Sequence, residues 1–350
     1  MSFHDFMEMA LYYPGLGYYT SEQDKIGVKG DFYTSPHFTS LFGEMIARQL
    51  EEMWHFSGRD EFTIVECGAG TGALCRDVLS QLKNNKELYR RLNYCIIEKS
   101  EAMRKKEKAI LFEKVNWYDS IEDIPRFTGC VISNELLDNF SVHQVVMKDE
   151  LMEVFVDHKN GFVESLRPAS AALKEYIAQL NVELPYGFRT EINLEAIKWL
   201  GEISATLEKG FVMTIDYGSS SSELYRENRS KGTLVCYNKH RINDNPYWNI
   251  GNQDITAHVN FSALRHWGSM SGLEYCGYTD QANFLHSLGI VEHLRQKERS
   301  GRHANAGIIN NAFLVHTLLT DMGNKFKVLI QQKGIPQPSL SGLRFSSQTV

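Results

Sequence analysis

The feature that most constrains the fold is a glycine-rich segment between a strand-like run and a helix-like run. Residues 62–67 (Phe-Thr-Ile-Val-Glu-Cys) form a short apolar run typical of a buried strand. Residues 68–72 (Gly-Ala-Gly-Thr-Gly) follow directly, and residues 74–82 then repeat apolar side chains at helical spacing. Glycines allow a sharp turn and a close approach of the backbone to a ligand. We therefore predict a strand–loop–helix unit with a flat, polar ligand over the loop.

Two cofactors fit this loop. Gly68-x-Gly70-x-x-Ala73 also satisfies the dinucleotide fingerprint, in which a helix N-terminus holds a pyrophosphate. Three features favour S-adenosylmethionine: the acidic Glu66 before the first glycine, the alternation of glycines up to Gly72, and a helical segment of over fifty residues before the first strand. The methyl donor is the better interpretation, and an NAD-dependent dehydrogenase stays open as an alternative.

Further strands point to a mostly parallel α/β sheet. Residues 94–98, 130–134 and 211–216 are apolar runs that end in Glu98, Asn134 and Asp216. Ligands bind at the carboxyl ends of such strands, and a carboxylate at Glu98 can accept both hydrogens of a ribose diol. Two more strands are predicted at the end of the chain, the last of them antiparallel: residues 273–278 and 326–331.

The chain is predicted to have three parts. Residues 1–60 form an N-terminal helical extension that caps the cofactor site, residues 61–333 form the core, and residues 334–350 form a loosely ordered tail. The core carries insertions at about 140–190 and 219–261. An amphipathic helix at residues 194–207 is grouped with the first insertion, as part of a lid or partner surface.

A second helix of the extension is predicted to begin at Thr34-Ser35-Pro36 and to continue its apolar face from Phe38 to Trp54. Free N–H groups at its start would attract an anion, such as the carboxylate of the methionine moiety. An ordinary N-cap explains the same residues equally well.

Composition excludes several classes of partner. The net charge of −6 and the isoelectric point near 6.1 give no footprint for nucleic acid. The six cysteines include no C-x-x-C pair, so we expect reduced thiols and no metal. No apolar run is long enough for a membrane span, and the first residues lack a signal or transit pattern, so the expected location is the cytoplasm.

Several motifs follow one another in a specific order. They are the glycine loop together with residues 30–36 (Gly-Asp-Phe-Tyr-Thr-Ser-Pro), 134–138 (Asn-Glu-Leu-Leu-Asp), 216–218 (Asp-Tyr-Gly) and 254–259 (Asp-Ile-Thr-Ala-His-Val). In these motifs the chain resembles the MidA-like methyltransferase family, from Phe3 to about Gln331. That family includes the mitochondrial complex I assembly factor that methylates an arginine of a complex I subunit.

The resemblance implies a class I methyltransferase fold, S-adenosylmethionine as donor and a protein arginine, possibly on a respiratory complex subunit, as acceptor. Two departures weaken the substrate inference: Ser141 and Asn260 stand where relatives commonly have proline and aspartate. Gly68, Gly70, Gly72 and Glu98 match the cofactor positions of the family residue by residue. The other candidate cofactor residues are Thr34, Ser35, Glu66, Ala69 and Asn134.

Carboxylates at strand ends are the candidates for holding a guanidinium by paired hydrogen bonds. We expect Glu135 to do so, with Asp138 beside it, although an acid at a helix start explains Asp138 equally well. Asp216 or His258 is expected to accept the departing proton, while a single histidine is more often structural. Two other functions stay open: methylation of a small molecule, and an assembly chaperone that binds the cofactor without turnover.

Overall fold

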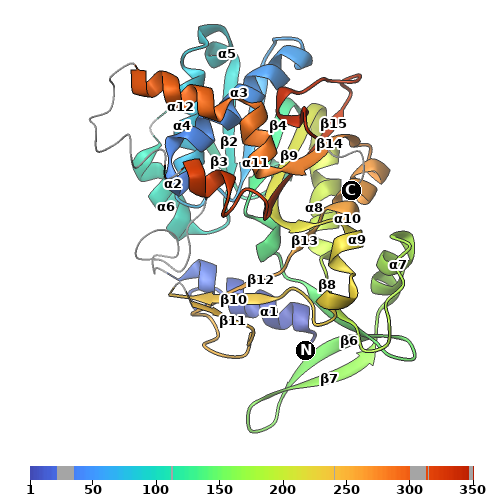
Figure 1. The fold of residues 1–350 in the computed structure, drawn as a ribbon. Coiled ribbons are helices and arrows are strands. Elements are labelled where there is room, and N and C mark those ends of the chain that lie inside the picture. The colour runs from blue at the N-terminus through green and yellow to red at the C-terminus, as the bar shows by residue number, and fades with distance from the viewer. Residues whose placement is uncertain (22–34, 112, 240, 300–312, 314, 347–349) are drawn as a thin grey trace.

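The computed structural model describes residues 1–21, 35–111, 113–239, 241–299, 313, 315–346 and 350. Figure 1 shows a large sheet covered by helices, with a smaller β-rich region below it. The large sheet has strand order β14-β15-β9-β4-β1-β2-β3, and β13 pairs with β9. Its strands are β1 (Phe62–Cys67), β2 (Leu92–Ile97), β3 (Val115–Tyr118), β4 (Phe127–Asn134), β9 (Leu207–Ser219), β13 (Val259–Asn260), β14 (Glu274–Asp280) and β15 (Phe326–Lys333).

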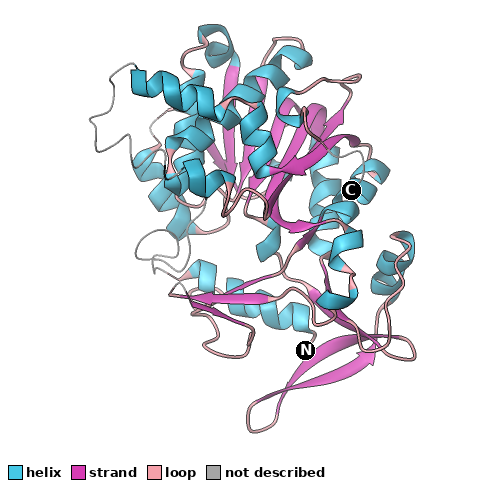
Figure 2. Cartoon of the chain, in the orientation of Figure 1, coloured by secondary structure: helices cyan, strands magenta, loops and turns pink. Residues whose placement is uncertain are grey.

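The direction of the strands confirms the predicted α/β class. The five strands from β9 to β3 run parallel, whereas β15 is antiparallel to both β9 and β14. Parallel strands need a crossover connection, so helices cover both faces of this sheet (Figure 2). The sheet is mostly parallel with a final antiparallel strand, as the sequence predicted.

Neighbouring strand residues point into different helical layers, because side chains alternate across a strand. Ile64 of β1 packs in one cluster with α3 (Ser40–Ser57), α4 (Ala73–Leu82) and α11 (Gln281–Ser287). Val65 packs in the other cluster with α8 (Leu194–Thr206) and α10 (Phe261–Met270). The prediction that α8 belongs to an insertion was therefore wrong, because its apolar face covers the main sheet.

The expected continuous helix from residue 35 is two helices. Only Ser35–Phe38 is helical at first (α2), and α3 begins at Ser40. Between them Thr39 has an extended backbone (φ −164°, ψ 148°), and its hydroxyl accepts a hydrogen bond of 3.3 Å from the N–H of Leu41. A threonine hydroxyl that captures a backbone N–H in this way favours a helix start over a helix interior. The predicted helix start at Thr34, and Asp31 in the same motif, lie outside the described residues.

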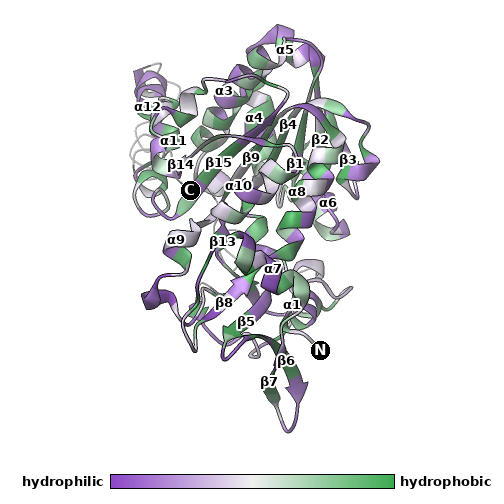
Figure 3. Cartoon of the chain, turned by 90° about the vertical axis from the view of Figure 1, so that its right-hand side faces the viewer, coloured by the Kyte–Doolittle hydropathy of each residue, from purple (hydrophilic) through white to green (hydrophobic). Residues whose placement is uncertain are grey.

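The smaller region, here called the accessory lobe, contains two sheets and a helix. Its four-stranded sheet has order β7-β6-β5-β8 and its three-stranded sheet has order β11-β10-β12. The strands are β5 (His143–Met147), β6 (Leu151–His158), β7 (Phe162–Pro168), β8 (Arg189–Ile192), β10 (Val235–Asn238), β11 (Arg241–Asn243) and β12 (Asp254–Thr256), and α7 (Ala171–Gln179) lies beside them. Figure 3 shows this lobe below one end of the main sheet.

The N-terminal helix α1 (Phe3–Tyr12) packs in the accessory lobe. Its residues Phe3 and Met7 form an apolar cluster with Val154 of β6, Cys236 of β10 and Ile255 of β12. The side chain of Ser2 caps the helix by accepting a 3.1 Å hydrogen bond from the N–H of Asp5. Residues 1–60 are thus shared between two parts of the molecule, because α1 lies with the insertions and α3 lies on the main sheet.

The expected loosely ordered tail packs against the core over its described residues. Ile335, Leu340 and Leu343 are buried in the same cluster as α3 and α11. Gln49 accepts a 3.0 Å hydrogen bond from the N–H of Gly342. The burial of these apolar side chains therefore holds the segment on the core, although its proline and serine content is typical of a loop.

Candidate active site

The glycine loop connects β1 to α4 at the carboxyl edge of the sheet. Gly68, Gly70 and Gly72 have φ angles of +70°, +58° and +78°, which L side chains rarely adopt. The N–H of Gly68 donates a 2.9 Å hydrogen bond to the carbonyl of Ile97 at the end of β2. A Cβ atom added at Gly68 would lie 2.7 Å from Cδ1 of Leu136, so nothing larger than glycine fits without movement of its neighbour.

Two predicted acids lie on different sides of this loop. Glu66 is buried, and its carboxylate accepts a 2.6 Å hydrogen bond from the hydroxyl of Tyr94; burial raises the pKa of Glu66 to about 7. Glu98 follows β2 directly, and its Oε1 accepts a 2.8 Å hydrogen bond from the N–H of Ser100. Burial also raises the pKa of Glu98. Glu98 therefore stands at the ligand edge, whereas Glu66 supports the loop from the protein interior.

Glu135 combines an unusual backbone with a shared carboxylate. Its φ of +54° is uncommon for a residue with a side chain, and such strain of about 1–3 kcal/mol collects at functional sites. One oxygen, Oε1, accepts hydrogen bonds from the N–H of Ser35 (3.0 Å) and from Nδ2 of Asn134 (3.1 Å). Burial raises the pKa of Glu135 to about 8, and the charge of Asp216 adds to this rise.

Ser35, a predicted cofactor residue, is thus hydrogen-bonded to Glu135, a predicted catalytic residue. Its N–H donates to Glu135, and its hydroxyl donates a 3.2 Å hydrogen bond to Oε1 of Gln281 on α11. The acceptor found at this short helix start is the carboxyl group of Glu135, a group of the protein itself.

Asp216 of β9 is fully buried beside the segment that follows β4. Its Oδ2 accepts hydrogen bonds from the N–H groups of Leu136 (3.1 Å) and Leu137 (2.8 Å), and its Oδ1 accepts one from Tyr217 (2.8 Å). Burial raises the pKa of Asp216 to about 7 although these bonds favour the charged form. Asp216 therefore shapes the backbone that presents Glu135 and Asp138.

Asp138 lies where several carboxyl groups meet. Burial raises its pKa well above the usual range, and the charges of Asp216, Asp254 and Glu135 raise it further. Its Oδ1 is buried and has no hydrogen-bond partner among the described residues, and the same is true of Oδ1 of Asn134. Buried acceptors are nearly always paired in folded proteins, so these atoms indicate a ligand that donates hydrogen bonds. We call Glu135, Asp138, Asp216 and Asp254 the acid cluster.

Two tyrosines that sequence reasoning missed border the acid cluster. The hydroxyl of Tyr19 donates a 2.9 Å hydrogen bond to Oδ1 of Asp254, and that of Tyr12 donates a 3.0 Å bond to the carbonyl of Asn139. Their rings stack with centroids 5.5 Å apart. The hydroxyl of Ser100 donates to the carbonyl of Tyr19 (3.2 Å), so Tyr19 connects the Glu98 region with Asp254. No local motif signals this role, because it depends on contacts across the whole chain.

His258 is engaged by a cation. Nη1 of Arg229 lies 3.0 Å from its Nδ1, and its ring lies nearly perpendicular to that of Tyr217, with 4.3 Å between the ring centroids. Burial, and then the charge of Arg229, lower the pKa of His258 to about 4. Because arginine only donates, the neutral ring keeps its proton on Nε2. This geometry favours a hydrogen-bond donor at Nε2 over a proton acceptor.

Comparison with known proteins identifies the chemistry. Residues 45–279 match the family described as "Putative S-adenosyl-L-methionine-dependent methyltransferase". The chain belongs to this family. The methyltransferase is 27% identical, over 95% of its chain and 81% of the relative, to a Drosophila melanogaster protein named a mitochondrial protein arginine methyltransferase. The mouse protein of that name is 26% identical, over 83% of this chain and 71% of its own.

A solved structure supports the cofactor directly. A Burkholderia thailandensis protein with bound S-adenosyl-homocysteine is 32% identical to the methyltransferase, with a TM-score of 0.88 over 99% of this chain and 91% of that chain. S-adenosyl-homocysteine is S-adenosylmethionine without its methyl group. The predicted family, the class I fold and the cofactor are therefore confirmed, and the dehydrogenase alternative is set aside.

The residues of the methyltransferase fit S-adenosylmethionine. The loop from Gly68 to Gly72 has no side chain where the backbone turns, Glu98 offers a carboxylate at the end of β2, and Asn134 offers a buried acceptor without a partner. When bound, the cofactor supplies an electrophilic methyl group on a sulfonium sulfur.

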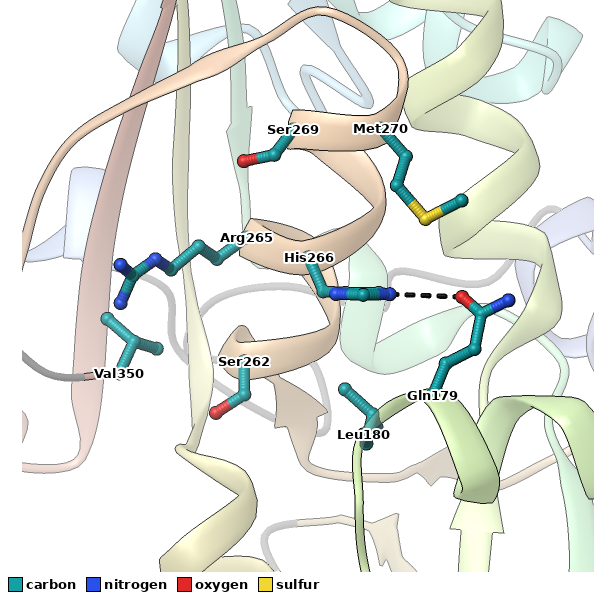
Figure 4. A pocket seen from close by; sticks show the side chains of 8 residues that line it. All are labelled: Gln179, Leu180, Ser262, Arg265, His266, Ser269, Met270 and Val350. Atoms are coloured by element: carbon teal, nitrogen blue, oxygen red, sulfur yellow. Dashed lines mark hydrogen bonds between the residues drawn. The ribbon is translucent and has the colours of Figure 1, made fainter.

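The surface cavity of Figure 4 lies apart from this site. It encloses about 550 Å³ between α10, the end of α7 and Val350, and its lining includes Arg265 and Met270. His266 points toward Gln179 across it, with 3.0 Å between Nε2 and Oε1. None of the predicted site residues lines this cavity.

The described residues contain neither a candidate metal site nor a candidate membrane span. The six cysteines are free thiols, and among the described residues no cluster of three or more potential ligands could hold a metal ion. Within the same part of the chain, no helix combines the length and apolarity that crossing a bilayer requires.

Proposed function

We propose that this methyltransferase methylates an arginine side chain of a protein, and that the acid cluster holds the guanidinium. The observation that carries this proposal is the unpaired, buried Oδ1 of Asp138 among three other carboxyl groups. The names of the Drosophila and mouse relatives support the same acceptor. A respiratory complex subunit as substrate, and the cytoplasm as location, remain predictions from the sequence.

Electrostatics favours a cationic acceptor. Four carboxyl groups that share a buried site cannot all ionise without a compensating charge, and the raised pKa values of Glu135, Asp138 and Asp216 express this conflict. A guanidinium relieves it, because its fork of N–H donors pairs with carboxylates and its charge favours their ionised form. A neutral acceptor would leave the repulsion in place.

The cluster also lies on the side of the cofactor loop. Leu136, between Glu135 and Asp138, is the residue whose side chain would contact a Cβ atom at Gly68. The proposed cofactor residues Thr34, Ser35, Glu66, Gly68, Ala69, Gly70, Gly72, Glu98 and Asn134 and the proposed acceptor residues therefore belong to one site. Thr34 enters this proposal from the sequence alone.

Each residue of the cluster has a distinct proposed task. Glu135, fixed by Ser35 and Asn134, orients the guanidinium so that one nitrogen faces the methyl group. During transfer a carbon–nitrogen bond forms, the carbon–sulfur bond breaks, and the methylated nitrogen gives up one proton. Asp138, whose Oδ1 has no hydrogen-bond donor among the described residues, accepts that proton. Asp216 fixes the backbone between Glu135 and Asp138 by accepting hydrogen bonds from Leu136 and Leu137. His258 offers the N–H group of its Nε2 as a hydrogen-bond donor.

The test uses labelled S-adenosylmethionine and lysate from cells that lack this protein. We expect label in a protein band that yields methylarginine on hydrolysis, and no label with Glu135→Gln. Label in a small-molecule fraction would replace the protein acceptor by a small one. Cofactor binding with no transfer to any fraction would favour an assembly chaperone without turnover.

A further inference from the structure

The three-stranded sheet of the accessory lobe presents one row of side chains toward the acid cluster. In its register Tyr237 of β10 lies opposite Ile242 of β11 and opposite Asp254 of β12. Directly opposed residues of antiparallel strands point to the same face. The neighbouring residues Cys236 and Ile255 point the other way and pack against α1. The row Ile242–Tyr237–Asp254 therefore lies on the face that is turned away from α1, and we call it the track.

Exposure falls steadily along the track. Ile242 is 69% exposed, Tyr237 is half-buried and Asp254 is 2% exposed. Burial raises the pKa of Tyr237 to about 12, and the charges of Tyr217, Asp138 and Asp254 contribute to the rise. The inner end of the track thus lies within the electrostatic reach of the acid cluster, and its outer end opens to solvent.

The outer end of the track exposes two large apolar side chains among polar neighbours. Ile242 and Trp248, which is 53% exposed, line a surface cavity of about 620 Å³ together with Arg241. An exposed tryptophan beside an exposed isoleucine is the composition of an interface anchor, since aromatic residues dominate binding energy in interfaces. Arg241, in the same cavity, offers a cation to an acidic neighbour on the partner.

We propose that the track seats an extended segment of the acceptor protein, a deepening that rests on the proposed function. One large apolar side chain of that segment packs on Ile242 and Trp248, and its arginine reaches the acid cluster, which the track meets at Asp254. The charge complementarity between the cluster and an arginine selects a protein segment as the occupant. Trp248 and Ile242 thereby set which arginines are reached.

The geometry predicts a spacing for the substrate. Neighbouring strands lie about 4.8 Å apart, so two strand spacings separate Ile242 from Asp254 by about 10 Å. An extended chain advances about 3.3 Å per residue, so the apolar residue and the arginine should be about three positions apart. The separation of about three positions applies whether the arginine precedes or follows the apolar residue in the substrate, because it depends only on the width of the sheet.

The experiment uses synthetic 13-residue peptides in a polar Gly/Ser/Thr background. Each contains one arginine and one leucine, separated by one to six positions on either side, and methyl transfer from labelled S-adenosylmethionine is measured. We expect kcat/KM to peak at a separation of about three. Ile242→Asp and Trp248→Ala should each raise KM for the best peptide about tenfold, with kcat changed less than twofold. Tyr186→Ala, which removes an even more exposed aromatic residue elsewhere in the accessory lobe, should change neither.

The outcomes separate the track from the function beneath it. Labelling of all peptides regardless of spacing, or an unchanged KM in both track variants, would overturn the track while leaving arginine methylation intact. A wild-type protein that binds S-adenosylmethionine and labels none of the peptides or lysate proteins would overturn the proposed function and the track together. Calorimetric cofactor affinity of the variants, expected within twofold of wild type, verifies that they are folded.

Discussion

The proposed cofactor half and the proposed acceptor half of this site are built by different means. The cofactor half consists of a backbone turn with three glycines at positive φ and one acid, all between residues 66 and 98. The acceptor half gathers four carboxyl groups from three separate segments, and its Tyr19–Asp254 bond joins residues 235 positions apart. One half is encoded by local spacing, and the other exists only after the chain has folded.

The two halves also differ in what they cost the fold. Glycine turns cost backbone entropy, of about 0.5–1 kcal/mol for each glycine relative to alanine in regular structure. The acceptor half buries carboxyl groups that are ordinarily charged in water. The raised pKa values of Glu135 and Asp216 reflect the free-energy cost of burying their charged forms. A site that is unfavourable when empty is suited to a ligand of opposite charge, because binding relieves the repulsion.

The largest expected effect comes from filling the cofactor loop. Gly68→Val places a branched side chain at φ +70°, where its Cβ would lie 2.7 Å from Leu136. We expect affinity for S-adenosylmethionine to fall at least 100-fold, measured by calorimetry, and methyl transfer to be lost with it. Gly272→Ala is the matched control, because it has φ +88° but no atom within 4 Å of the added Cβ. It should cost about 1 kcal/mol of stability and leave cofactor affinity unchanged. Equal cofactor affinity in both variants would show that the loop does not approach the ligand.

The second effect should be confined to the acceptor half. Glu135→Gln keeps the shape of the side chain but removes the charge that orients the guanidinium, so we expect kcat to fall roughly 100-fold or more. Cofactor affinity should stay within threefold, which places the loss after cofactor binding. Glu150→Gln, at an exposed turn, should leave both quantities unchanged. A Glu135→Gln variant with normal turnover would remove Glu135 from the proposed mechanism.

The contrast between the halves also explains what could be predicted from the sequence. β1, the glycine loop, α4 and the strands β2, β4, β9, β14 and β15 follow local patterns of apolar spacing and turn residues, and they were confirmed. The position of α8 was wrong because an amphipathic helix does not reveal which surface it covers. The roles of Tyr12 and Tyr19 and the contact of Ser35 with Glu135 could not be predicted from the sequence, because each depends on a hydrogen bond between distant segments.

A third effect should appear in the pH dependence of stability. The folded-state pKa of Glu135, about 8, lies above its ordinary value of 4.5, so the folded protein holds a proton that the unfolded chain releases in between. Stability is therefore lost as pH rises from about 4.5 to 8 and changes little above that range. We expect this loss between pH 5 and 8 to be smaller by roughly 3 kcal/mol in Glu135→Gln, measured by urea unfolding without ligand. Parallel curves for the two proteins would mean that the acid cluster carries no such strain.

The smallest effect tests the boundary between the halves, because Tyr19 touches both. Tyr19→Phe removes the hydrogen bond to Asp254 but keeps the ring that stacks on Tyr12 and the carbonyl that accepts from Ser100. With one hydrogen bond worth about 1 kcal/mol, KM for the acceptor should rise about fivefold, while kcat and cofactor affinity change less than twofold. Tyr13→Phe, at an exposed position, is the control. An equal loss of cofactor affinity would mean that the Ser100 contact carries the change to Glu98, and the two halves would then have to be treated as one coupled site.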